Sequence, residues 1–92
     1  MAQQCAVIQG DPQSVVSQLI NLNGNILIVE KTTSSGKFIV IYDTIYANQT
    51  FTIISGDPSK LALEISSLIT LGKIIDLITP TFSSSQYIVV ST

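Results

Sequence analysis

The residues Gly10-Asp11-Pro12 close a short apolar run and open a helical pattern, and the same three residues recur as Gly56-Asp57-Pro58. Asp is a strong helix N-cap, because its carboxylate accepts a hydrogen bond from a backbone N–H of the first turn. Proline suits the first helical position, and glycine lets the chain turn sharply out of a strand. Each triplet therefore predicts a corner between a strand and a helix.

A second interpretation of the triplets is an anion site, since helix N-termini bind phosphates. An anion would meet the Asp carboxylate here, and the chain has neither a glycine-rich loop nor a Lys or Ser/Thr at P-loop spacing. Capping is therefore the favoured role. Ligand binding at Gly10, Asp11, Gly56 and Asp57 is kept as the alternative.

The same order of elements follows from the apolar pattern in both halves of the chain. Apolar residues three and four apart, such as Val15 with Leu19 and Leu61 with Ile65, predict a helix after each corner, ended by Gly24 and Gly72. Short apolar runs predict strands at residues 5–8, 26–29, 37–42, 51–54, 73–78 and 86–90. The sequence thus predicts one domain, residues 1–92, made of two tandem β-α-β-β repeats at about residues 4–43 and 50–92.

These elements predict an α+β sandwich, in which a mainly antiparallel sheet carries two helices on one face. The layout resembles the ferredoxin-like α/β plait with one extra hairpin strand. The link at residues 44–49 either turns to a neighbouring strand or crosses the sheet to begin the second half.

Composition restricts the possible partners. The 92 residues are 46% hydrophobic and only 11% charged, against ~25% charged in typical globular chains, with a net charge of −2 and no arginine. Nucleic-acid binding favours a basic, Arg-rich patch, so we expect none. A signal peptide and an apolar run long enough to span a membrane are both absent from the sequence, so we expect no membrane association and a cytoplasmic or virion-associated location.

The strands are apolar on both of their faces. Phe38 and Val40 oppose Ile39 and Ile41, and Ile26 and Ile28 are expected to share a face. Two helices cover only one face of a sheet, which would leave an apolar patch larger than monomers usually expose. We therefore expect a homodimer or higher homo-oligomer through an apolar sheet face. The alternative is a sheet that closes on itself as a barrel.

Few residues could carry chemistry. The chain has no histidine, which removes the commonest acid/base group and most metal sites. Its single cysteine, Cys5, is expected to be a buried strand residue, and Asp43 is expected to mark an exposed strand end. We therefore predict no catalytic residue, no metal site, no cofactor and no enzymatic activity.

Asp76 is unusual because it interrupts an apolar strand, where a carboxylate is costly unless it is solvated or paired. One interpretation is an edge strand protected by a charge. The other is a polar group in a ligand pocket, with Tyr87 or Tyr46 as its hydrogen-bond partner.

The predicted function is a non-enzymatic, self-associating structural or interaction module. The alternative is a small-molecule-binding or regulatory α/β domain, with a pocket near the strand-helix corners or at the seam of a dimer.

Overall fold

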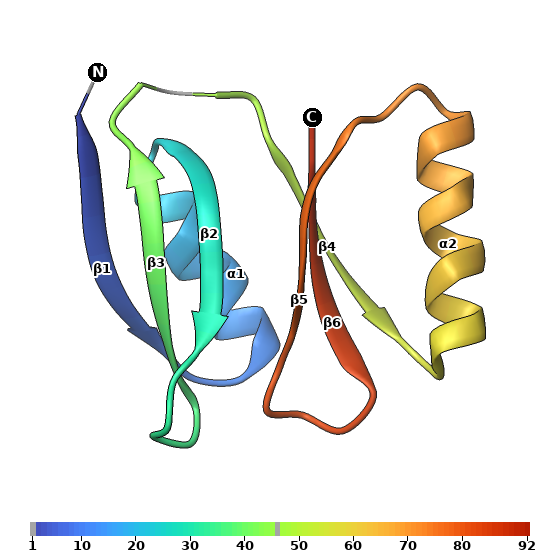
Figure 1. The fold of residues 1–92 in the computed structure, drawn as a ribbon, viewed down its shortest axis with the longest axis horizontal. Coiled ribbons are helices and arrows are strands. Elements are labelled where there is room, and N and C mark those ends of the chain that lie inside the picture. Colours follow the sequence, from blue (N-terminus) through green and yellow to red (C-terminus); the bar gives the residue numbers. More distant parts are fainter. Residues whose placement is uncertain (1, 46) are drawn as a thin grey trace.

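The computed structural model describes residues 2–45 and 47–92, which form two helices and two antiparallel three-stranded sheets (Figure 1). The elements in chain order are β1 (Gln3–Gln9), α1 (Pro12–Asn21), β2 (Asn25–Lys31), β3 (Lys37–Asp43), β4 (Thr50–Ser55), α2 (Pro58–Thr70), β5 (Ile75–Pro80) and β6 (Gln86–Ser91). The first sheet has the order β1-β3-β2 and the second sheet has the order β4-β6-β5. The protein is therefore an α+β fold.

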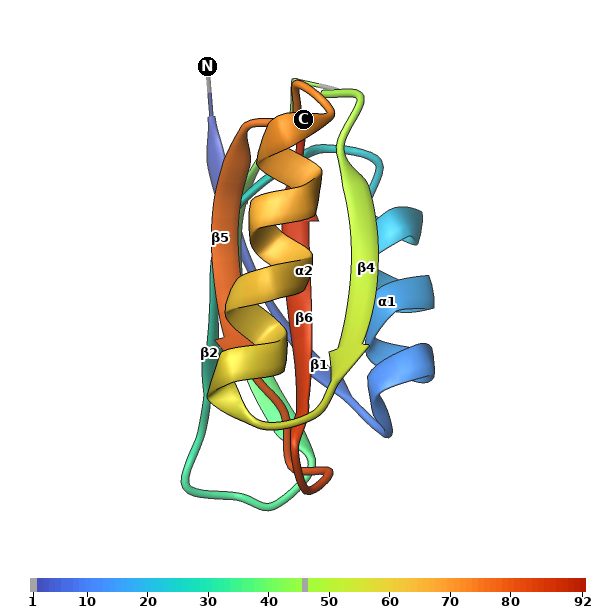
Figure 2. The ribbon, with the colours of Figure 1, turned by 90° about the vertical axis from the view of Figure 1, so that its right-hand side faces the viewer.

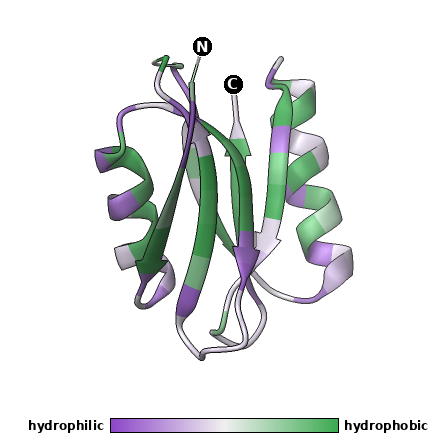
Figure 3. Cartoon of the chain, turned by 60° about the vertical axis from the view of Figure 1, so that its left-hand side comes forward, coloured by the Kyte–Doolittle hydropathy of each residue, from purple (hydrophilic) through white to green (hydrophobic). Residues whose placement is uncertain are grey.

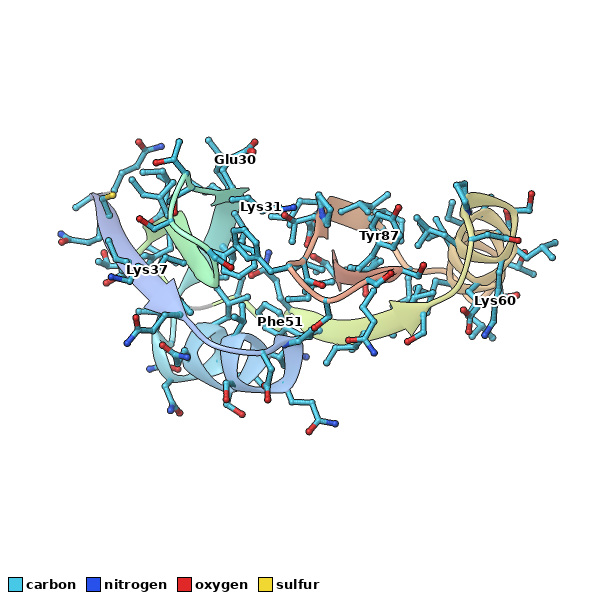
Figure 4. The ribbon with its side chains drawn as sticks, turned by 90° about the horizontal axis from the view of Figure 1, so that it is seen from below. Glu30, Lys31, Lys37, Phe51, Lys60 and Tyr87 are labelled. Atoms are coloured by element: carbon cyan, nitrogen blue, oxygen red, sulfur yellow. The ribbon has the colours of Figure 1, made fainter. Side chains whose placement is uncertain are left out.

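The strands do not form the single sheet that the sequence analysis predicted. The chain leaves the first sheet after β3, and β4 begins a separate sheet whose edge strand β5 lies beside β2. The helices also differ from the prediction, because α1 contacts β1, β4 and β6, whereas α2 lies on the other side of the second sheet (Figures 2 and 4). The strand orders do not establish the ferredoxin-like layout.

Both predicted corners are confirmed. Oδ1 of Asp11 accepts a 2.8 Å hydrogen bond from the backbone N–H of Ser14, and Oδ1 of Asp57 accepts one of 2.9 Å from Lys60. Each proline occupies the first turn of its helix. The preceding glycines, Gly10 and Gly56, have φ values of 128° and 137°, which an L-residue adopts only with strain.

The helix ends follow the prediction at one site and not at the other. Gly72 follows α2 with φ of 90°, and its N–H donates to the carbonyl of Ile69 at 3.0 Å. After α1, the left-handed position belongs to Asn23, with φ of 55°, and not to Gly24. Gly24 is needed for another reason, because a Cβ there would lie 2.2 Å from the backbone oxygen of Asp43.

A bulge in each hairpin changes which side chains share a face. The pairing of β2 with β3 shifts between Ile26 and Ile28, and the pairing of β5 with β6 shifts between Ile75 and Leu77. The extra residue puts Ile26 and Val29 in the core and leaves Ile28 46% exposed. The expectation that Ile26 and Ile28 share a face is therefore wrong, because simple alternation fails across a bulge.

The core lies between the first sheet, α1 and one face of the second sheet. Its buried members come from both halves: Ile8, Val15, Leu19, Ile26, Val29, Phe38, Val40, Ile88 and Val90. One face of the second sheet is thus covered within the chain, by the first half, and needs no second copy. This contact leaves the apolar side chains of β1, β2 and β3 that point away from α1 uncovered.

Candidate functional site

The first corner contributes to a cavity. Asp11 and Gln13 from the start of α1 face Ser55, Ser83 and Gln86 from the end of the second sheet, around a volume of about 430 Å³. The lining is largely polar. Asp57 and Gly56 belong to the other corner, so the structure does not gather the four predicted corner residues into one site.

Asp76 lies exposed in the bulge of β5, which is an edge strand. Its Oδ2 accepts hydrogen bonds from Nε2 of Gln49, at 3.1 Å, and from the hydroxyl of Thr92. Tyr87 pairs with Ile54 and Pro80, at the far end of β5 from Asp76. The structure therefore does not bring Asp76 and Tyr87 together, and Tyr46 lies outside the described residues.

Gln49 is the residue that gives Asp76 a structural role, and the sequence analysis missed it. Oε1 of Gln49 accepts from the N–H of Ile26 at 2.8 Å, and Nε2 donates to the carbonyl of Ile26 at 3.1 Å. The amide thus pairs with the backbone of β2 as a neighbouring strand would, and Asp76 orients it. An isolated Gln in a link has no sequence signal for this role.

Three further contacts join the halves at the seam between β2 and β5 or close to it. The hydroxyl of Thr79 donates to the carbonyl of Val29 at 3.1 Å. The ring of Phe82 meets the ring of Phe38 edge-on at 5.2 Å, and Nζ of Lys31 lies 4.6 Å from the centroid of Phe82. These contacts fix the second sheet against the first half.

The first sheet presents an apolar surface on the side away from α1. We call it the outer face, and it consists of Cys5, Val7, Ile28, Ile39 and Ile41. Val7 pairs with Ile39 across the ladder, and Ile41 pairs with Cys5 on one side and Ile28 on the other, so these side chains are contiguous. Cys5 is exposed, which contradicts its expected burial. Figure 3 shows long hydrophobic stretches in the strands, with hydrophilic residues at several strand ends.

Helix α2 is only loosely covered, in contrast to α1. None of its residues, all of which the structure describes, is buried, whereas α1 buries Pro12, Val15 and Leu19. Helix α2 lies on the side of the second sheet that faces away from the first half. We call the apolar surface on this side the α2–β5 face, and it consists of Leu61, Ile65, Ile75, Ile78 and Tyr87. Its aromatic member, Tyr87, points toward α2, while Phe51 lies on the α1 side (Figure 4).

Asp43 is buried, which corrects its expected position at an exposed strand end. It is 5% exposed, and its Oδ1 accepts a hydrogen bond of 3.1 Å from the N–H of Ile45. The carboxylate therefore holds the turn that leaves β3, in a local arrangement typical of Asp in turns.

Comparison with protein-family models, with curated proteins and with solved structures finds no significant match. No helix among residues 2–45 and 47–92 is long and apolar enough to cross a membrane. In the same part of the chain, no group of three or more Cys, Asp or Glu side chains is placed to hold a metal ion.

Proposed function

We propose that this protein is a non-enzymatic structural or interaction module that self-associates through its apolar faces. The observation that carries this proposal is the outer face, where Val7 is 68% exposed and Ile39, its cross-strand neighbour, is 39% exposed. Contiguous exposed apolar side chains on a sheet mark contact surfaces in soluble domains. The absence of histidine from the chain supports the non-enzymatic part.

We further propose that the two halves are structural repeats. Both have the order strand, helix, strand, strand, and both place the third strand of the half in the centre of its sheet. The turns after β2 and β5 are alike, because Thr32 and Thr81 each accept a hydrogen bond from the N–H two residues later. Gly36 and Ser85 end these turns with positive φ values of 78° and 58°. Shared caps, bulges and turns support a common plan.

Self-association is tested by sedimentation velocity from low micromolar to near-millimolar concentration, together with alkylation of Cys5. We expect a size above that of the monomer, and an alkylation rate that falls as concentration rises, because Cys5 belongs to the outer face. Val7→Glu should keep the protein monomeric and the thiol open at every concentration. Ser17→Glu, on the exposed side of α1, is the matched control and should behave as the parent chain does. A parent chain that stays monomeric throughout would remove the proposal.

A second function, binding of a small polar molecule, is favoured by the cavity at the first corner. Asp11 disfavours an anion there, whereas Gln13, Ser83 and Gln86 offer hydrogen bonds to a neutral or cationic ligand. A thermal-shift screen with nucleotides, amino acids and sugars tests this, and Ser55→Leu should fill the cavity and abolish any shift. If no compound raises the melting temperature, this second function loses its support.

A further inference from the structure

Five residues that are buried in the first half have exposed or half-buried counterparts in the second half. With the corners and turns aligned, the counterparts are Val15 and Leu61, Leu19 and Ile65, Ile26 and Ile75, Val29 and Ile78, and Phe38 and Tyr87. The first member of each pair is at most 5% exposed, whereas Ile78 is 45% exposed and the other four second members are half-buried. The difference arises because the second sheet closes over the first set. The second set is the α2–β5 face.

The reverse difference is found on the sides of the sheets that face away from their own helices. Here the second sheet is the better covered, in the pairs Phe51 and Cys5, Ile53 and Val7, Leu77 and Ile28, Ile88 and Ile39, and Val90 and Ile41. The first member of each pair is buried or packs half-buried against the core, whereas the second members are exposed, except for the half-buried Ile41. Ile88 is 0% exposed, whereas Ile39 is 39% exposed. The chain therefore contains one intramolecular contact, and the counterparts of its two surfaces lie at two other places, where they are only partly covered.

We propose that the outer face of one copy packs against the α2–β5 face of a second copy, as the second sheet packs against the first half within one chain. This inference rests on the proposed self-association and gives its geometry. In Figure 4, Glu30 beside the outer face and the edge strand β5 lie on the same side of the molecule, opposite α1. Two copies related by a twofold axis can therefore make this contact twice, as a closed dimer.

Charges at the end of this contact are complementary between copies. Within one chain, Gln86 and Asp11 line the same cavity. Their counterparts are Lys37 and Asp57, which carry opposite charges. The proposed contact places Lys37 of one copy near Asp57 of the other, and such pairs favour this orientation of the two surfaces.

One counterpart opposes the contact and so provides a test. Glu30 occupies the position that corresponds to Thr79, which is 1% exposed, and burial of a carboxylate without a partner is costly. The contact between copies is therefore weaker than the one within the chain. Glu30→Thr should tighten the dimer several-fold.

The decisive experiment uses one variant on each face, Ile39→Glu on the outer face and Ile78→Glu on the α2–β5 face. Both positions are exposed, so the variants should fold, as circular dichroism will check. Each variant alone should be monomeric in sedimentation velocity, with association weakened about tenfold or more, because both contacts of its dimer are disrupted. An equal mixture should form a heterodimer, because one contact in the pair is intact on both sides.

The outcomes separate this inference from the proposed function. If the parent chain associates but Ile78→Glu dimerises as tightly as the parent, the outer face pairs with itself and the inference is wrong, while self-association stands. A mixture that stays monomeric would contradict the inference in the same way. Growth beyond two copies would contradict the closed dimer. A monomeric parent chain would remove the proposed function as well.

Discussion

The hydroxyl of Thr79 donates a hydrogen bond of 3.1 Å to the backbone carbonyl of Val29, 50 residues earlier in the chain, across the seam between β5 and β2. The two strands belong to separate sheets, so a side chain provides the polar link that a backbone ladder provides elsewhere. Thr79 is buried, and its substitution would leave the Val29 carbonyl without this donor.

We therefore expect Thr79→Val, which keeps the shape of the side chain, to lower the free energy of unfolding by about 1–3 kcal/mol, the typical cost of an unsatisfied buried group. Urea denaturation measures the change. Thr33→Val, at an exposed position in the turn after β2, is the control and should change stability by less than about 0.5 kcal/mol. Equal effects of the two substitutions would mean that the Thr79 bond contributes nothing to the seam.

We expect truncation of Leu19 and of its counterpart Ile65 to lower the free energy of unfolding by unequal amounts. Leu19 is 1% exposed in the core, so Leu19→Ala should cost about 2–5 kcal/mol through lost contacts and a cavity. Ile65 is half-buried on α2, so Ile65→Ala should cost about 1 kcal/mol, since less apolar surface is removed from water there. Both are measured by urea denaturation at low protein concentration. Similar losses would show that α2 packs as tightly as α1.

We expect loss of the N-cap of α1 to lower global stability, and loss of the N-cap of α2 to affect mainly the local stability of α2. Asp11→Ala and Asp57→Ala each remove a cap worth about 1 kcal/mol. Because α1 carries buried core residues, the loss at Asp11 should lower global stability by that amount. Because α2 buries no residue among its thirteen, the loss at Asp57 should mainly increase local opening. Amide hydrogen exchange should show faster exchange throughout α2 in Asp57→Ala, with little change in the sheets. Uniformly faster exchange would contradict the local opening.

Gly24 and Gly36 require glycine for two different reasons, close packing at Gly24 and a positive φ at Gly36. A Cβ at Gly24 would lie 2.2 Å from the Asp43 backbone oxygen, so Gly24→Ala must displace the end of β3 and should cost about 1–3 kcal/mol. Gly36 has φ of 78° with open space around it, so Gly36→Ala should cost only the strain of that conformation, about 1 kcal/mol. Thermal denaturation compares the two. A larger loss at Gly36 would mean that the chain relaxes easily around Gly24.

The elements themselves were predictable because their signals are local. Both corners, the two helices and all six strands follow from capping residues and apolar spacing over a few positions. Most strand ends in the structure differ by one or two residues from those predicted from the sequence. The bulges at Leu27 and Asp76 were not predictable, because a bulge depends on how the neighbouring strand pairs.

The exposed apolar surfaces were harder to predict from the sequence than the helices and strands. The apolar character of both strand faces was readable in the sequence, but not which face is covered within the chain. Ile88 and Ile39 are alike in the sequence, yet one is in the core and the other is exposed. Cys5 and Asp43 were assigned the wrong exposure for the same reason, because burial is decided by which elements pack together.

The sequence by itself determined where the chain turns, which segments are helices and strands, and that the strands are apolar on both sides, because these depend on the intrinsic conformations of a few neighbouring residues. The tertiary structure alone decided that there are two sheets, that the second covers the first half, and that the outer face and the α2–β5 face remain only partly covered. These outcomes depend on contacts between residues far apart in the chain, such as Thr79 with Val29 and Gln49 with Ile26. Local spacing carries no record of such contacts.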